Sequence, residues 1–358
     1  MIRTIELAGT SRAMGRHFGE AFRAEISELY ALRVRNALTQ AQQYGGVTAS
    51  ESDLRAFSEA CLASTRPFDP DGFAELEGIA EGAGLPIASV MALGGLTDLR
   101  DGLAWGGHLE ATGGCSSCLV PRASTREHEV LAAQTWDLQS ENMPFVVAVK
   151  RRPEQGPRTA SVTTVGCLSL IAINEDGLAI GTTNLRTLDA RVGVPYLSLI
   201  HKALACPSLE AAAIAIEQAT RAGGHYYWLA DARGRGLGLE CSATRCVRSE
   251  LADRSFVHCN HALEPAIAAL EGKQDHQSSH ARHTRLEELF EGWDGDVDAQ
   301  AIQSFLGDEA GGVNAICRHD YNGISTNAAA VALPERGELL ACQGYPCEAD
   351  WERLVPAC

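Results

Sequence analysis

The stretch Thr112-Gly113-Gly114-Cys115-Ser116-Ser117-Cys118-Leu119 lies where the sequence changes character. Before it, apolar residues recur at the spacing of helices, and after it most segments have the pattern of β-strands. Gly114 has no side chain, so the backbone ahead of Cys115 can take the unusual dihedral angles that attack of the thiol on the preceding carbonyl requires. The stretch therefore predicts a self-cleaving nucleophile at the start of a β-rich segment.

The chemistry expected at Cys115 is an N-to-S acyl shift followed by hydrolysis of the resulting thioester. Cleavage between Gly114 and Cys115 leaves fragments 1–114 and 115–358, and we expect one domain, 1–358, in which the helical fragment stays bound to the β fragment as a heterodimer partner. The new α-amine has an unperturbed pKa of about 7.7–8.0. It is suited to act as the general base for the thiol of its own residue.

Two other interpretations of this cysteine stay open. Many buried cysteines are inert packing residues. Cys115 and Cys118 also form a C-x-x-C pair, which is typical of redox centres or of half a zinc site. Against that interpretation, the sequence has no second C-x-x-C pair, and no helical pattern follows Cys115.

Composition narrows the class of protein. The chain has 358 residues, of which 45% are hydrophobic, and a net charge of −16, which argues against binding to nucleic acid. Residues 1–6 lack the apolar run of a signal peptide, and no apolar segment is long enough to span a membrane. Twelve cysteines without a signal peptide indicate reduced thiols in a cytoplasmic protein. Composition is compatible with assembly of the heterodimer into a higher oligomer.

The order of the expected elements predicts an α+β protein with a four-layer αββα sandwich and an N-terminal helical segment. A doubly wound parallel sheet would need strict alternation of strands and helices, which is absent. Helices are expected at 11–43, 50–64, 71–83, 86–93, 194–205, from 208 onward, and at 279–291. Strands are expected at 115–121, 128–137, 145–150, 160–165, 168–173, 178–183, 225–230, 236–241, 244–249, 255–258, 313–317, 324–333 and 338–342.

Three polar residues at strand ends are candidate partners of Cys115. Asp137 ends a strand expected beside the one that starts at Cys115, and it is suited to hold the new amine; a solvated acid is the alternative. Asn184 ends a later strand, where it either binds substrate or caps a turn. Ser116, next to Cys115, is also assigned to substrate binding. Asn260 offers a neutral N–H donor for an oxyanion.

The surrounding His258-Cys259-Asn260-His261 has zinc-binding residue types. Positions i, i+1 and i+3 of an extended segment cannot converge on one ion, so neither a metal nor another cofactor is expected. His225 and the three aromatic residues that follow it are interpreted as a packing stripe in a sheet.

Taken in order, these motifs resemble the acyl-CoA:6-aminopenicillanate acyltransferase family, also called the isopenicillin N acyltransferase or peptidase C45 group of N-terminal nucleophile hydrolases. The motifs are Glu77–Leu85, Gly113–Ser117, Gln134-Thr135-Trp136-Asp137, Gly177–Asn184, Asp231 with Gly238-Leu239-Glu240, and Asn260-His261. The resemblance implies an αββα fold, cleavage before Cys115, Asp137 near the new amine and Asn260 in the oxyanion hole.

The chain departs from that family's pattern at two places. Thr135 stands where the family usually has Asn. Penicillin-forming members carry an arginine near the C-terminal sheet. No residue of this chain is assigned to that position within the segment that holds Arg318, Tyr321, Asn322 and Ser325.

The chemistry predicts a thioester acyl-enzyme that acts on a small N-acyl amine or amide. No basic cluster suited to the phosphates of coenzyme A is evident, so hydrolysis is preferred. Transfer of an acyl group from acyl-CoA or an amide to a small amine is the second possibility, and a non-enzymatic binding module is the third.

Overall fold

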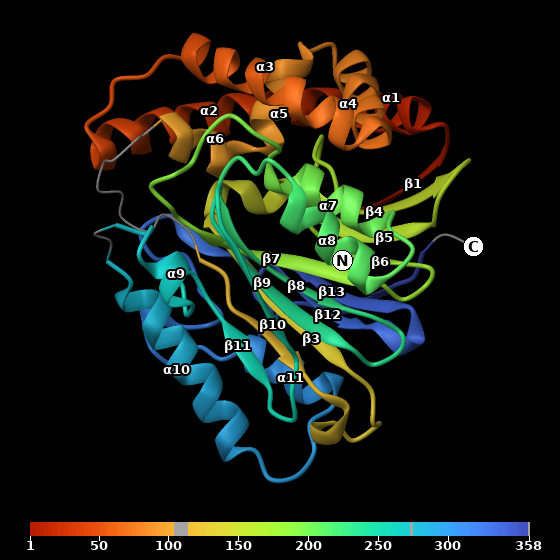
Figure 1. Ribbon diagram of the computed structural model, residues 1–358, viewed down its shortest axis with the longest axis vertical. Coiled ribbons are helices and arrows are strands. Elements are labelled where there is room, and N and C mark those ends of the chain that lie inside the picture. Colours follow the sequence, from red (N-terminus) through yellow and green to blue (C-terminus); the bar gives the residue numbers. More distant parts are fainter. Residues whose placement is uncertain (104–113, 273–274, 357–358) are drawn as a thin grey trace.

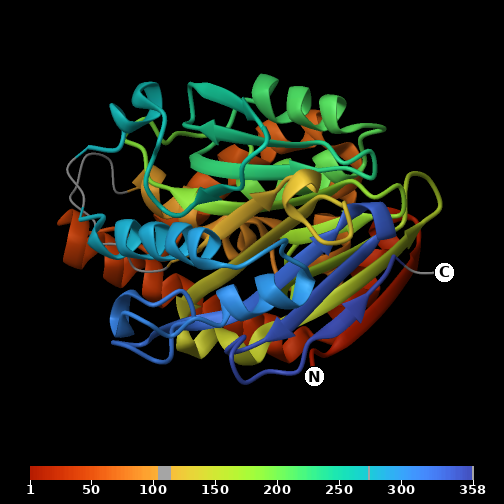
Figure 2. The same ribbon diagram turned by 90° about the horizontal axis from the view of Figure 1, so that it is seen from below.

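The computed structural model describes residues 1–103, 114–272 and 275–356, with the backbone alone at 43–45. Two sheets pack face to face, and helices cover the outer face of each, as Figure 1 shows. Figure 2 looks onto the outer layer formed by α10 (Gln277–Gly292) and α11 (Ala299–Leu306). The predicted four-layer αββα sandwich is confirmed.

The larger sheet has the order β1-β4-β5-β6-β7-β8-β9-β10 and the smaller one β11-β2-β3-β12-β13-β14. All neighbours are antiparallel except β1 and β4, which are parallel. The strands of the larger sheet are β1 (Thr4–Gly9), β4 (Val146–Pro153), β5 (Thr159–Thr164), β6 (Ile171–Asn174), β7 (Ala179–Leu185), β8 (Gly224–Ala230), β9 (Gly236–Cys241) and β10 (Cys246–Glu250). Those of the smaller sheet are β2 (Ser117–Val120), β3 (Leu131–Gln139), β11 (Phe256–His258), β12 (Ile324–Leu333), β13 (Glu338–Gln343) and β14 (Glu352–Leu354).

Side chains alternate between the two faces of the smaller sheet, as the period of a strand requires. Leu119 and Ala132 belong to the core shared with the larger sheet. Their neighbours Cys118, Leu131 and Ala133 join the separate core under α10 and α11. This alternation in β2 and β3 produces two apolar layers from one pair of strands.

The remaining helices lie on the larger sheet or at its edge. They are α1 (Ser11–Ala21), α2 (Arg23–Gly45), α3 (Glu51–Phe68), α4 (Pro70–Ala83), α5 (Ile87–Gly94), α6 (Leu96–Leu103), α7 (Tyr196–Leu204), α8 (Leu209–Gln218) and α9 (Pro265–Ala268). The single helix expected at 11–43 is two helices, because Phe22 leaves the helical region with φ −121° and ψ 25°. Helix α3 continues through Pro67, beyond the end expected at residue 64.

The Glu77–Leu85 motif has a packing explanation. Gly78 and Gly82 of α4 meet Gly15 and Gly19 of α1 at a close helix crossing, where a Cβ atom on Gly78 would lie 2.1 Å from the carbonyl oxygen of Arg12. Only glycine permits that approach.

Several short elements differ from expectation. Residues 313–317 are not a strand; a 3₁₀ turn at Gly312–Asn314 and an extended loop take their place. Strands β1 and β14 and helices α6 and α11 were not predicted, because each is short or lacks a clear apolar period. No single helix in the described ranges is long and apolar enough to cross a membrane, although α4 and α5, bent by 111°, pass that test together on length and composition.

Candidate active site

The backbone before Cys115 continues the pairing of β2 with β3. Gly114 and Asp137 form an antiparallel bridge, in which the Gly114 N–H donates to the Asp137 carbonyl at 3.1 Å. The Asp137 N–H donates in return to the Gly114 carbonyl oxygen at 2.7 Å. The prediction that these two segments lie side by side is therefore confirmed, although β3 continues beyond Asp137 to Gln139 and β2 begins at Ser117, two residues after Cys115.

A side chain at position 114 would not fit. A Cβ atom there would lie 2.8 Å from Oδ2 of Asp137 and 3.2 Å from Nη2 of Arg282. Glycine thus brings the peptide bond between Gly114 and Cys115 directly against a carboxylate and a guanidinium group.

The thiol of Cys115 is buried, with 7% of the residue exposed. Burial, and next the charge of Asp137, raise the pKa of the Cys115 thiol to about 12, although Arg282 opposes the shift. Backbone groups of Asp137 and Asn184 hydrogen bond to the sulfur and also lower this pKa. At neutral pH the thiol is therefore protonated, and it needs a base to become a nucleophile.

Asp137 has one satisfied and one unsatisfied carboxylate oxygen. Oδ1 accepts a hydrogen bond from the Thr326 hydroxyl at 2.8 Å. Among the described residues Oδ2 is buried without a hydrogen-bond partner, and Nε of Arg318 lies 3.9 Å from it. Burial raises the pKa of the Asp137 carboxyl, and the charges of Arg318 and Arg282 oppose that shift. A buried acceptor that no described residue satisfies is costly, so a hydrogen-bond donor placed beside Gly114 would be stabilised here.

The Asn260 side chain joins three segments. Its Oδ1 accepts from the backbone N–H of Cys115 at 2.7 Å and from Nη2 of Arg282 at 2.9 Å. Its Nδ2 donates to the backbone carbonyl of Asn184 at 2.9 Å. The structure thus brings Cys115, Asp137, Asn184 and Asn260 together, as the sequence predicts, although Asn184 contacts Asn260 through its main chain.

Asn184 reaches the site because Gln134 joins the two sheets. The Gln134 side chain donates to the carbonyl of Thr182 at 3.0 Å and accepts from the N–H of Thr182 at 2.7 Å. It also accepts from Nε1 of Trp228 at 2.7 Å. These contacts hold β3 of the smaller sheet against β7 of the larger one, so that Asp137 and Asn184, near the ends of the two strands, line the same cavity.

Ser116 lies deeper than expected of a substrate-binding residue. It is fully buried and does not line the cavity described below. Its N–H donates to the Thr135 hydroxyl at 3.1 Å, and its own hydroxyl accepts from Arg282 at 3.0 Å. Thr135, which departs from the family pattern, therefore holds the backbone next to Cys115.

Sequence reasoning missed Arg282, which lies on α10. Its guanidinium donates to the carbonyl of Cys115, to Ser116 and to Asn260, and only 1% of the residue is exposed. Nothing in the charged pattern of 279–291 separates this arginine from its neighbours. The segment in which the family's arginine was left unassigned contains Arg318, and the structure puts Arg318 against Asp137. Tyr321 of the same segment is 41% exposed.

A cavity of about 1130 Å³, including its open mouth, ends at Cys115, Asp137 and Asn260. Its walls come from both sheets and from the N-terminal helices. The apolar lining residues include Leu93, Leu96, Trp136, Leu138, Leu170 and Tyr196, and the basic ones are Arg33, Arg100, Arg186 and two histidines, His225 and His276.

Two expectations about histidines can be compared with the structure. His225 belongs to a buried stripe, as predicted, but its Nε2 also pairs with Oδ1 of Asp98 at 2.7 Å at the cavity wall. His258 pairs with Glu240 at 2.9 Å, while His261 hydrogen bonds to Ser279 at 2.7 Å. These two histidines therefore have separate protein partners.

The two sheets, the helical layers and a cysteine two residues before the central strand β2 are the architecture of the N-terminal nucleophile hydrolases. A model of the acyl-coenzyme A:6-aminopenicillanic acid acyl-transferase family matches residues 124–336, and the chain belongs to this family. The sequence-based resemblance is thereby confirmed, as is the expectation of an enzyme that acts on carbon–nitrogen bonds.

Three known proteins illustrate the likeness. The acyl-coenzyme A:6-aminopenicillanic-acid-acyltransferase 40 kDa form of Emericella nidulans is 25% identical over 302 residues, which are 82% of this chain and 78% of that protein. A mutant of conjugated bile acid hydrolase from Clostridium perfringens has a TM-score of 0.42 at 10% identity, covering 67% of this chain and 96% of that one. Penicillin V acylase from Agrobacterium tumefaciens has a TM-score of 0.40 at 12% identity, covering 64% of this chain and 82% of that one.

Proposed function

We propose that the protein is a self-processing N-terminal cysteine amidohydrolase that cleaves a small N-acyl amine through a thioester acyl-enzyme. The observation that carries the proposal is the environment of the bond between Gly114 and Cys115. The carbonyl oxygen of this bond accepts the Asp137 N–H at 2.7 Å, and its amide N–H donates to Oδ1 of Asn260 at 2.7 Å. Both ends of one peptide bond are thus held beside a thiol.

Self-cleavage follows from these contacts. The Cys115 sulfur attacks the Gly114 carbonyl carbon, and the oxygen that becomes negative is stabilised by the Asp137 N–H. The C–N bond breaks, the thiol proton passes to the leaving nitrogen, and the amine stays beside Asn260. Water then hydrolyses the thioester, which releases the Gly114 carboxylate and regenerates the thiol.

Turnover uses the group that cleavage creates. The free amine of Cys115 removes the proton from its own thiol, which is needed because burial keeps that thiol protonated. Oδ2 of Asp137, which has no hydrogen-bond partner in the part of the chain that the structure describes, accepts a hydrogen bond from the resulting ammonium. The Nδ2 group of Asn260, which donates to the Asn184 carbonyl in the intact chain, is the neutral donor that stabilises the substrate oxyanion.

The cavity favours a substrate with an apolar acyl group and a carboxylate. Arg33 is 6% exposed, lines the cavity, and donates to the side chain of Asn142 and the carbonyl of Leu93. Within the described ranges, no carboxylate pairs with it. A buried guanidinium without a counter-ion is unfavourable, and a substrate carboxylate can satisfy it by a charge-assisted hydrogen bond.

The two fragments remain one folded body in this proposal. Strand β1 of fragment 1–114 pairs with β4 of fragment 115–358, and α1 and α4 complete the large core. We place the enzyme in the cytoplasm, without a nucleic-acid or membrane partner, because the chain is acidic and its described cysteines are free thiols.

Acyl transfer is the second candidate, favoured by the family match and by the relative from Emericella nidulans. The deciding experiment incubates matured protein with a panel of N-acyl amines, with and without acyl-CoA donors, and quantifies the free amine and the new amide. We expect release of amine and carboxylate without any thioester. Amide formation that depends on acyl-CoA, with no hydrolysis of any amide, would reverse the assignment.

A further inference from the structure

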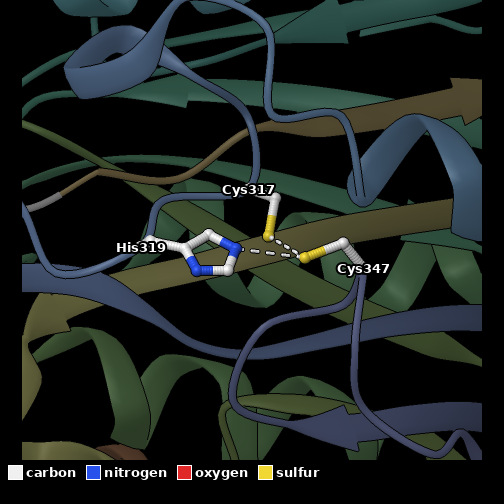
Figure 3. Close-up of side chains that lie close together, drawn as sticks. All are labelled: Cys317, His319 and Cys347. Carbon is white, nitrogen blue, oxygen red and sulfur yellow. Dashed lines mark hydrogen bonds between the residues drawn. The ribbon is translucent and has the colours of Figure 1, made fainter.

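Outside the cavity, two cysteines and a histidine from separate loops face one another (Figure 3). Cys317 and His319 lie in the loop before β12, and Cys347 lies between β13 and β14. The two sulfur atoms are 3.4 Å apart, and Nε2 of His319 is 3.2 Å from the sulfur of Cys347. All three donor atoms lie within 4.8 Å of one another.

We propose that these residues bind a zinc ion. Thiolate sulfur and imidazole nitrogen are the donors that zinc prefers, with bonds of about 2.3 Å and 2.0–2.1 Å. Tetrahedral angles with those bonds separate two sulfurs by about 3.8 Å and a sulfur from a nitrogen by about 3.5 Å. The observed separations are only a few tenths of an ångström shorter, so small side-chain rotations admit the ion.

The surroundings of the histidine fit this role. Its ring stacks on Tyr345, with centroids 4.1 Å apart and planes inclined by 21°. Oε1 of Glu309 lies 3.0 Å from Nε2, on the solvent side, where it is placed to become the fourth ligand by rotation. Carboxylate oxygen is an accepted zinc ligand.

A disulfide between Cys317 and Cys347 is the competing arrangement. It would need the sulfurs to approach to about 2.05 Å, and it would leave His319 without a role. The zinc site uses all three side chains and suits a protein whose other described cysteines are free thiols.

The site is tied to the active site through the residue after Cys317. The N–H of Arg318 donates to the hydroxyl of Thr326 at 2.9 Å, and the N–H of Thr326 donates to the carbonyl of Arg318 at 2.9 Å. The same hydroxyl of Thr326 contacts Asp137. A metal that clamps the two loops therefore holds Arg318 against Asp137, which makes this a structural zinc site with a positioning effect.

The test is metal content measured on full-length protein purified under reducing conditions without chelator. Native mass spectrometry and elemental analysis are expected to find one zinc per chain. The surface substitutions Cys347→Ser and His319→Ala should lower the zinc content to background. Cys317→Ser should lower it equally if that variant folds. Cys206→Ser, at the end of α7, is the matched control and should retain the ion.

Reconstitution with Co²⁺ gives a second readout. A thiolate-to-cobalt charge-transfer band that disappears in Cys347→Ser but persists in Cys206→Ser supports the site. Wild-type protein that stays free of metal after zinc addition, or that carries a disulfide between Cys317 and Cys347 after purification under reductant, would overturn it. Zinc that survives all three substitutions would place the metal elsewhere and would also overturn it.

Discussion

The backbone N–H of Asp137 donates to the carbonyl oxygen of Gly114 at 2.7 Å, while the Asp137 carboxylate approaches the same glycine from its side chain. In the proposed mechanism one residue thus offers a hydrogen-bond donor for self-cleavage and a charge for the amine that cleavage would release. These two roles can be separated by mutation, because one belongs to the main chain and the other to the side chain.

Asp137→Asn should process itself and then fail in turnover. The substitution keeps the main-chain donor but removes the charge that holds the ammonium, so we expect kcat to fall by more than the rate of self-cleavage. The two rates are measured by intact mass spectrometry over time and by release of amine. A variant with normal kcat, or one that stays a single chain, would contradict this division of roles.

Cys115→Ala should remain a single chain of 358 residues, because no nucleophile remains at the cleavage site. Wild-type protein should give fragments 1–114 and 115–358. Cys118→Ala is the matched control, since that sulfur belongs to the core under α10 and α11 and not to the cavity. If Cys118→Ala abolished cleavage or activity, the C-x-x-C pair would act as a redox unit instead.

Asn260→Ala should lower kcat by roughly 10²–10³-fold if the amide stabilises the substrate oxyanion.

Asn184→Ala should change KM more than kcat, because the contact from Asn184 to Asn260 comes from its backbone carbonyl. Steady-state kinetics on pre-matured samples separates the two effects. An unchanged kcat in Asn260→Ala would remove Asn260 from catalysis.

Arg33→Met should raise KM about 10- to 100-fold for a substrate with a carboxylate, since a hydrogen bond to a charged group contributes about 1.5–3 kcal/mol. The neutral amide analogue of the same substrate should lose little. Arg33→Lys, which keeps the charge, serves as the control for stability. Equal losses on both substrates would show that Arg33 only supports the fold.

Folding stability should fall in mild acid because of His261. Burial, and next the neighbouring His280, lower the pKa of His261 to about 3, whereas the unfolded chain has the usual value of about 6.5. Between these values the unfolded state binds the proton and the folded state does not. The free energy of unfolding therefore falls by roughly 1 kcal/mol for each pH unit below about 6.5. Urea unfolding from pH 7.5 to 5 measures this slope. His261→Gln should reduce it, and burial of His276 and His283, which also lowers their pKa values, accounts for slope that remains.

The sequence predicts the layers and the central site residues because both follow from local patterns. The change of period at Cys115 marks the boundary, and polar residues at the ends of strands, such as Asp137 and Asn184, share a rim once the strands pair. Arg282 could not be predicted, because its role depends on how α10 crosses the smaller sheet. The loop at 313–317 has β-branched and apolar residues, yet it begins in the 3₁₀ turn Gly312–Asn314 and pairs with none of the described strands.

Strand β1 lies at the edge of the larger sheet and pairs only with β4 among the described strands. In the proposed mechanism, cleavage before Cys115 would leave β1 and β4 on two different polypeptides that share one sheet. Because that pairing forms in the intact chain, before any peptide bond is cut, activity should not depend on protein concentration and should survive dilution. Fragments synthesised separately would have to associate as partly unfolded chains. The peptide bond before Cys115 would therefore be needed for folding and assembly but not for the activity that follows.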